Sequence, residues 1–188
     1  MITVVTGLPR SGTSLTMQML RAGGYPILYD KEPNCDLNNP RGYYEWKSAN
    51  KLHGEDNRDA KRDSNLALAD GKCVKIFTFA FFAFSPMFDY QFIYVDRNID
   101  QVQKSHVAFF ERLGKNKMAA SADKLYEIRW HGMIYIKSFR HLILRHKDLY
   151  DGSAAEKIDE FLSNFRPREA SELLAMQSCV DESLLHFK

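Results

Sequence analysis

The sequence predicts an α/β fold, a single domain spanning residues 1–188 in which a parallel sheet of about five strands is flanked by helices. Short apolar runs rich in β-branched residues alternate with segments of helical periodicity, which is typical of parallel sheets. The first run passes through a Gly- and Pro-containing turn directly into such a helical segment. A chain of 188 residues is also long enough to bury one substantial core.

Each predicted strand is a short run of apolar, β-branched or aromatic residues. The strands expected are Ile2–Thr6, Pro26–Tyr29, Lys72–Phe77, Gln91–Val95 and His141–Arg145. Between and after them, apolar residues recur with helical spacing. The helices expected are Thr13–Ala22, Asp100–Leu113, Ala122–Ser138, Ala154–Phe165 and Pro167–Cys179.

Two segments have more than one interpretation. Residues 30–65 are rich in Asn, Asp, Lys and Arg, with a helix expected at Glu45–His53 and a very polar stretch at Gly54–Asn65. That stretch is read as a solvated loop, with a mobile lid over a binding site as the alternative. The aromatic run Phe77–Phe84 is read as core packing, with an apolar ligand pocket as the alternative.

Composition excludes several classes of function. A formal net charge of +2 is too small to indicate nucleic acid or an anionic membrane as a partner. Cys35, Cys73 and Cys179 are widely spaced, without CxxC or paired His, so neither a disulfide framework nor a zinc site is expected. No apolar run approaches the ~20 residues of a membrane-spanning helix, and no signal peptide precedes the first strand, so we expect a cytoplasmic protein.

The loop after the first strand has the features of an anion site. In Gly7-Leu8-Pro9-Arg10-Ser11-Gly12-Thr13-Ser14, backbone N–H groups and a helix N-terminus are expected to converge, with Arg10 and three hydroxyls as further donors. Gly7 and Gly12 have the spacing of a nucleoside-triphosphate loop, but Thr13 stands where that loop requires Lys. The loop therefore favours a phosphate-type ligand and argues against hydrolysis of ATP or GTP.

Taken together with this loop, the end of the strand Gln91–Val95 is a candidate for a second anion site. Arg97 follows this strand, and Ser105 lies eight residues further on, in the next predicted helix. An Arg fork and a hydroxyl two helical turns away can converge on one phosphate. The alternative is a surface ion pair beside a solvated serine.

These two sites, with the segment Asn39-Pro40-Arg41-Gly42-Tyr43-Tyr44-Glu45, resemble those of sulfotransferases that use 3′-phosphoadenosine-5′-phosphosulfate. The resemblance implies a P-loop-like sulfotransferase architecture and transfer of a sulfuryl group to a hydroxyl or amine, with 3′,5′-adenosine bisphosphate as product. It assigns the 5′-phosphosulfate to Arg10, Ser11, Gly12, Thr13 and Ser14, and the 3′-phosphate to Arg97 and Ser105. Leu144–Leu149 resembles a segment of the family that lies near the adenine, with His146 where Tyr is usual.

The resemblance also implies the catalytic groups. Arg10 is expected to hold the bridging oxygen and Lys75 to contact the sulfuryl oxygens. Phe77 stands where small-molecule sulfotransferases carry a basic His, so Glu45 is the expected general base, as in branches that use Glu. His53 and His106 are the alternative bases, and no metal is expected.

Two other functions are compatible with the sequence. A non-catalytic nucleotide-binding relative would explain the missing His, and the acceptor cannot be read from the residues. A P-loop nucleotide kinase is disfavoured by Thr13 and by the Arg97–Ser105 pair, which an ATP enzyme does not need.

Overall fold

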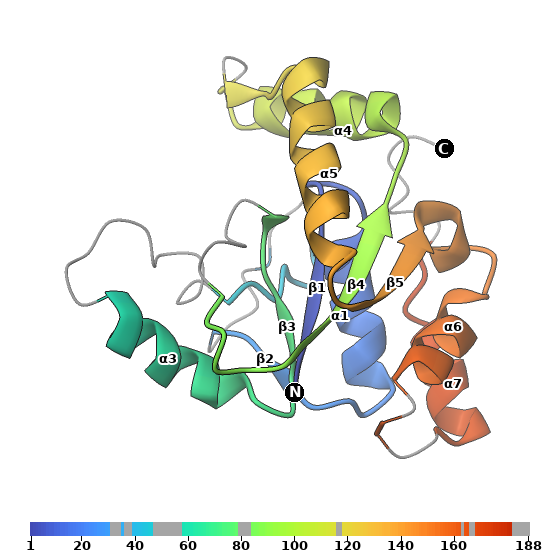
Figure 1. Ribbon diagram of the computed structural model, residues 1–188. Helices are drawn as coiled ribbons and strands as arrows, with labels where there is room; N and C mark the ends of the chain where they lie inside the picture. The colour runs from blue at the N-terminus through green and yellow to red at the C-terminus, as the bar shows by residue number, and fades with distance from the viewer. Residues whose placement is uncertain are drawn as a thin grey trace.

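A parallel sheet forms the centre of the fold (Figure 1). The computed structural model describes residues 1–30, 35, 39–46, 58–78, 84–115, 118–162, 164–165 and 168–181. Within these residues the sheet has five strands in the order β2-β3-β1-β4-β5, and all four neighbouring pairs are parallel. The strands are β1 (Ile2–Gly7), β2 (Ile27–Leu28), β3 (Cys73–Lys75), β4 (Tyr90–Asp96) and β5 (Arg140–Arg145). The predicted α/β class and parallel sheet are confirmed.

Helices cover both faces of this sheet (Figure 1). On one side lie α1 (Thr13–Ala22), α6 (Ala154–Phe161) and α7 (Ala170–Gln177). On the other lie α3 (Arg58–Ala69) and α5 (Ala122–Ile136), while α4 (Ile99–Arg112) packs against α5 beyond the end of β4. A short 3₁₀ helix, η3 (His146–Leu149), directly follows β5.

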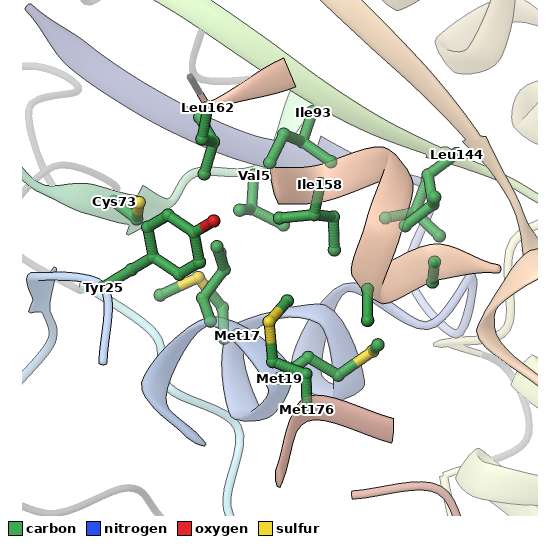
Figure 2. Close-up of a cluster of buried hydrophobic side chains, with 14 of the residues drawn as sticks. Val5, Met17, Met19, Tyr25, Cys73, Ile93, Leu144, Ile158, Leu162 and Met176 are labelled. Atoms are coloured by element: carbon green, nitrogen blue, oxygen red, sulfur yellow. The ribbon is translucent and has the colours of Figure 1, made fainter. Parts of the chain in front are cut away.

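The core is divided into two layers because successive strand residues point to opposite faces. Val5 of β1 and Ile93 of β4 pack with α1, α6 and α7, in the cluster shown in Figure 2. Their neighbours Val4 and Phe92 pack on the other side, against α3 and α5. All four side chains are fully buried, which explains why β1 and β4 read as continuous apolar runs.

Several predicted boundaries differ from the structure. The strand expected at Lys72–Phe77 is confined to Cys73–Lys75, and the last two helices end earlier than predicted, at Phe161 and Gln177. Glu45 and Trp46 are not helical, and the rest of the helix expected at Glu45–His53 lies outside the described residues. Residues 79–83 of the aromatic run also lie outside them.

The loop predicted at Gly54–Asn65 is wrong from Arg58 onward, where α3 begins. The first half of α3 is almost entirely polar, so its sequence has no apolar periodicity that would predict a helix. The apolar residues that anchor α3, Leu66 and Ala69, come only in its last turns, and both are buried against the sheet. Tertiary packing at one end therefore supports a helix that the polar end does not predict.

Candidate functional site

A cavity of about 380 Å³ opens at the carboxyl ends of the strands, where parallel α/β sheets bind their ligands. Four neighbouring strands each supply a residue just at or beyond their end: Lys75 from β3, Arg10 after β1, Arg97 after β4 and His146 after β5. The cavity is further lined by Thr13, Ser14, Gln18, Asn39, Tyr43, Glu45, Phe77, Ser105, His106, Phe109, Phe110, Tyr150 and Asp181.

The loop after β1 brings the backbone into a tight turn at the start of α1. Gly12 is the N-cap residue of α1 with φ 110°, and a Cβ there would meet Leu149 Cδ1 at 2.6 Å. Only glycine therefore fits this position. Thr13 and Ser14 open α1 and line the cavity, so the positive end of the helix dipole faces it.

Ser11 lies differently from the other predicted ligands in this loop. Its backbone N–H donates to the Leu8 carbonyl at 3.1 Å, and its fully buried side chain does not line the cavity. Within the described part of the chain, the Ser11 Oγ has no hydrogen-bond partner.

Arg10, Ser105 and Arg97 form one contiguous group. The Arg10 Nε donates to Ser105 Oγ at 3.2 Å, and the Arg97 Nη1 donates to the Arg10 carbonyl at 2.9 Å. Arg97 and Ser105 thus each contact Arg10, which lies between them. Their convergence on one phosphate stays a prediction. Arg97 is only 8% exposed. Burial lowers the pKa of Arg97, and so does the neighbouring charge of Arg10, whereas Tyr150 acts in the opposite direction. The opposite charge of an anion bound here would offset both the cost of burial and the repulsion from Arg10.

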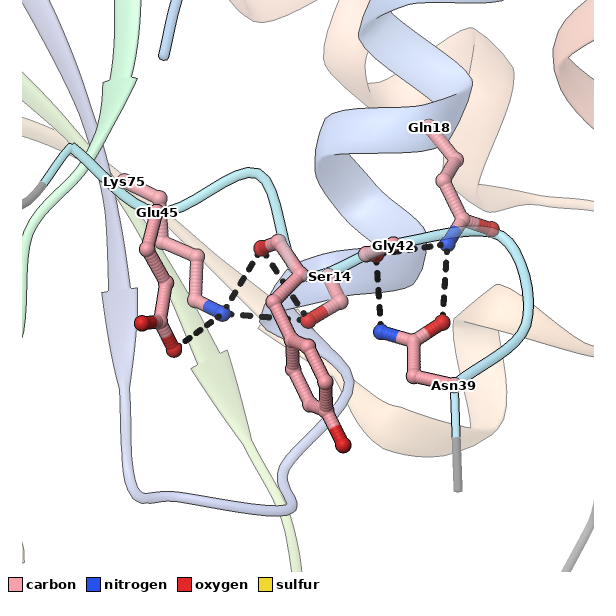
Figure 3. Close-up of polar contacts among 7 residues, drawn as sticks. Ser14, Gln18, Asn39, Gly42, Glu45 and Lys75 are labelled. Atoms are coloured by element: carbon pink, nitrogen blue, oxygen red, sulfur yellow. Dashed lines mark hydrogen bonds and ion pairs between the residues drawn. The ribbon is translucent and has the colours of Figure 1, made fainter. Parts of the chain in front are cut away.

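Lys75 is the centre of a second polar group, beside Ser14 in the first turn of α1 (Figure 3). Its Nζ donates to Ser14 Oγ and to the Tyr43 carbonyl, each at 3.0 Å, and lies 3.7 Å from Glu45 Oε1. Burial lowers the Lys75 pKa to about 8, although Glu45 acts in the opposite direction. The Glu45 side chain remains 27% exposed. The predicted catalytic pair Lys75 and Glu45 therefore lies at one end of the cavity.

Residues 39–46, the segment that carries Glu45, are hydrogen-bonded to α1. Gln18 donates to the Gly42 carbonyl at 3.3 Å and to Asn39 Oδ1 at 3.4 Å, and Asn39 Nδ2 donates to the same carbonyl at 2.7 Å (Figure 3). Arg41 donates to the carbonyl of Cys179 at 2.6 Å. Residues 39–46 are thus held by the same helix whose N-terminus faces the cavity.

His146 supplies a flat surface at the opposite end from Lys75. Its ring lies 4.9 Å from the Tyr150 ring, with 3.4 Å between His146 Nε2 and the Tyr150 hydroxyl. Burial, and then the charge of Arg97, lower the His146 pKa to about 4, so the imidazole is neutral near pH 7. A neutral ring pair of this kind suits the face of a purine.

No family model matches the sequence, and no curated protein matches it. Solved structures do resemble it. The sulfotransferase domain of the Synechococcus PCC 7002 olefin synthase aligns over 100% of this chain and 82% of its own, with a TM-score of 0.54 and 16% identity. The chain has the sulfotransferase fold. A second sulfotransferase domain, from the curacin biosynthetic pathway, aligns over 93% of this chain and 77% of its own, with a TM-score of 0.50 and 15% identity.

The donor set of this sulfotransferase fold fits a ligand with several negative charges. Arg10, Arg97 and Lys75 carry positive charge to one cavity, together with hydroxyls and a helix N-terminus. Across the described ranges, no group of three or more His, Cys, Asp or Glu side chains is arranged to hold a metal ion. Nor does any helix among those ranges combine the length and apolarity needed to span a membrane.

Sequence reasoning missed part of the lining of this sulfotransferase-fold site. Phe109 and Phe110 lie on α4 one turn beyond Ser105, and the Arg10 guanidinium lies 5.3 Å from the centre of the Phe109 ring. Tyr150 lies four residues after His146. Phe109, Phe110 and Tyr150 each lie four residues after a predicted site residue (Ser105, His106 and His146), so a search at that helical spacing finds all three. His53, one of the alternative bases, lies outside the described residues.

Proposed function

We propose that this chain transfers a sulfuryl group from 3′-phosphoadenosine-5′-phosphosulfate to a hydroxyl or amine acceptor. The observation that carries the proposal is the arrangement of Lys75, Arg10 and Arg97 at the ends of three neighbouring strands around one cavity. Three cations beside a helix N-terminus favour a ligand with separated anionic groups. The structural likeness to sulfotransferase domains supports the same class of reaction.

Each part of the cavity has a role in binding this donor. Thr13, Ser14 and the α1 N-terminus would hold the 5′-phosphosulfate, as the loop predicts. Arg97 and Ser105 would hold the 3′-phosphate. His146, backed by Tyr150, would lie against the adenine.

When bound, the donor supplies the sulfuryl group, with a nucleoside bisphosphate as leaving group. Glu45 would receive the proton of the acceptor hydroxyl or amine when the acceptor oxygen or nitrogen bonds to sulfur. Arg10 would offset the charge left on the 5′-phosphate as the sulfur–oxygen bond of the donor breaks, and Lys75 would stabilise the sulfuryl oxygens. Positioning and charge stabilisation then provide most of the rate acceleration, as in phosphoryl transfer.

Ligand binding followed by turnover tests the proposal. 3′,5′-Adenosine bisphosphate should raise the melting temperature far more than AMP or ATP at equal concentration. At 100 times its dissociation constant it adds about 2.7 kcal/mol to the free energy of unfolding. Equal shifts with AMP and the bisphosphate would contradict a 3′-phosphate site. Transfer of label from donor to a phenol, sugar or amine would show catalysis; tight binding without transfer to any acceptor would indicate a non-catalytic nucleotide-binding protein.

A further inference from the structure

His106 lines the cavity and directly follows Ser105 in the chain. One hydrogen bond determines which of its ring nitrogens carries the proton. The backbone N–H of Ala120 donates to His106 Nδ1 at 3.2 Å. A nitrogen that accepts a hydrogen bond carries a lone pair, so the proton of the neutral ring resides on Nε2. Within the described part of the chain no group is bonded to Nε2.

The surroundings of His106 keep the ring neutral. Burial lowers its pKa, and the positive charge of Arg10 lowers it further. Phe110 packs edge-on against the ring, with 4.9 Å between the ring centres. The imidazole, which lines the cavity, therefore carries its N–H on Nε2, in the field of the Arg10 charge.

Resting on the proposed function, we propose that His106 is a neutral hydrogen-bond donor, through Nε2–H, to an anionic oxygen of the bound sulfuryl donor. It is not the base that receives the acceptor's proton, because its lone pair is held by Ala120. An N–H beside Arg10 and Ser105 matches an oxygen of the sulfuryl group or of a phosphate of the donor, and the sulfuryl and phosphate sources can be distinguished experimentally.

The protonated nitrogen can be read directly by nitrogen NMR of histidine-labelled protein, with the His106 signals assigned from their loss in His106→Gln. At pH 7 we expect a neutral ring with hydrogen on Nε2. This reading needs neither ligand nor turnover, so it stays separate from the proposed function. A proton on Nδ1, or a charged ring at pH 7, would overturn the proposal.

Titration with nucleotides then identifies the oxygen. A shift of the Nε2–H signal with both the bisphosphate and the intact donor places the contact on the phosphate; a shift with the intact donor only places it on the sulfuryl group. If both nucleotides bind and neither moves the signal, the contact is refuted. If neither nucleotide binds, the proposed function fails and the ligand contact fails with it, whatever the tautomer.

Two matched variants separate a donor from a base. Gln retains an N–H donor on a side chain of similar reach, whereas Phe retains the ring and loses the donor. We expect His106→Gln to stay within about threefold of the parent in affinity for the intact donor, and His106→Phe to weaken it by about tenfold or more. Equal losses in both variants would refute the donor role, and a turnover loss of ~10²–10⁴ in His106→Gln at unchanged affinity would make His106 the base.

Discussion

Arg97 and His146 are proposed to face different parts of the same nucleotide, so their substitutions should have different signatures. Arg97→Ala should weaken the bisphosphate by about 1.5–3 kcal/mol while affecting AMP much less, because only the bisphosphate has a 3′-phosphate. His146→Ala is the matched control: it should weaken both ligands alike, since both contain adenine. Calorimetric titration of the two variants with the two ligands measures the difference. Equal weakening of AMP and bisphosphate in Arg97→Ala would make Arg97 a structural residue.

Glu45 is predicted to act in turnover and not in donor binding. Its carboxylate lies 3.7 Å from Lys75 Nζ and is partly exposed to the cavity. Glu45→Gln keeps the shape but cannot take a proton, so turnover should fall by ~10²–10⁴ while bisphosphate affinity is retained. The assay requires an acceptor identified by the screen with labelled donor. Near-normal turnover in Glu45→Gln would exclude Glu45 as the base.

Lys75 should give donor binding a pH dependence. Because its pKa lies at about 8, the ammonium loses its proton as the pH rises through that value. An anionic ligand favours the protonated form. Affinity for the intact donor, whose sulfuryl oxygens Lys75 is proposed to contact, should therefore be constant at lower pH and fall as the pH passes 8, by up to about tenfold. Titration calorimetry from pH 7 to 9.5 measures the fall. In Lys75→Met, affinity should be weak at every pH; a slope equal to that of the parent would assign the titration to another group.

At the level of the element, the end of β4 is held by α5. Arg129 makes a bidentate ion pair with Asp96, with Nε–Oδ1 at 2.7 Å and Nη2–Oδ2 at 2.8 Å. Asp96 is the last residue of β4 and precedes Arg97, whose guanidinium reaches the loop after β1. We therefore expect the pair to position Arg97 from a helix that does not itself line the cavity.

Arg129→Met should consequently lower the preference for the bisphosphate over AMP, by about fivefold. Lys124→Met is the control, because it removes an exposed ion pair with Glu127 on the same helix, a type of contact that contributes little. The ratio of the two dissociation constants is the measurement. An Arg129→Met protein that is less stable but keeps the parent ratio would show that the pair serves stability alone.

Elements with strong apolar signals could be predicted, and elements that depend on distant packing could not. β1 and β4 are buried on both faces, so apolar and β-branched residues dominate them and their limits differ from prediction by only a residue or so at each end. β3 has three residues and pairs on both sides, so its length is decided by its neighbours β1 and β2. The first half of α3 is polar and the helix is held by packing of its last turns, so the sequence does not predict where it begins.

The residues of the site divide in the same way, into those that sequence patterns predict and those whose contacts depend on the fold. Arg10, Lys75, Arg97 and Ser105 could be chosen because the short segments that carry them resemble those of sulfotransferases, and all four line one cavity. The direct hydrogen bond from Arg10 to Ser105 could not be foreseen, since these residues are 95 positions apart and meet only through the pairing of β1 with β4. The buried position of the Ser11 side chain depends likewise on the turn made by the folded loop.

At the scale of the whole molecule, the strand order β3-β1-β4-β5 is also the order of Lys75, Arg10, Arg97 and His146 along one edge of the sheet (Figure 1). Neighbouring strands are spaced by about 4.8 Å, so the outer two strands of these four are separated by about 14 Å. Hydrogen bonds between backbones set that distance, and side-chain substitutions leave it unchanged. A ligand that contacts both Lys75 and His146 would therefore have to span about three strand spacings, a length fixed by the backbone.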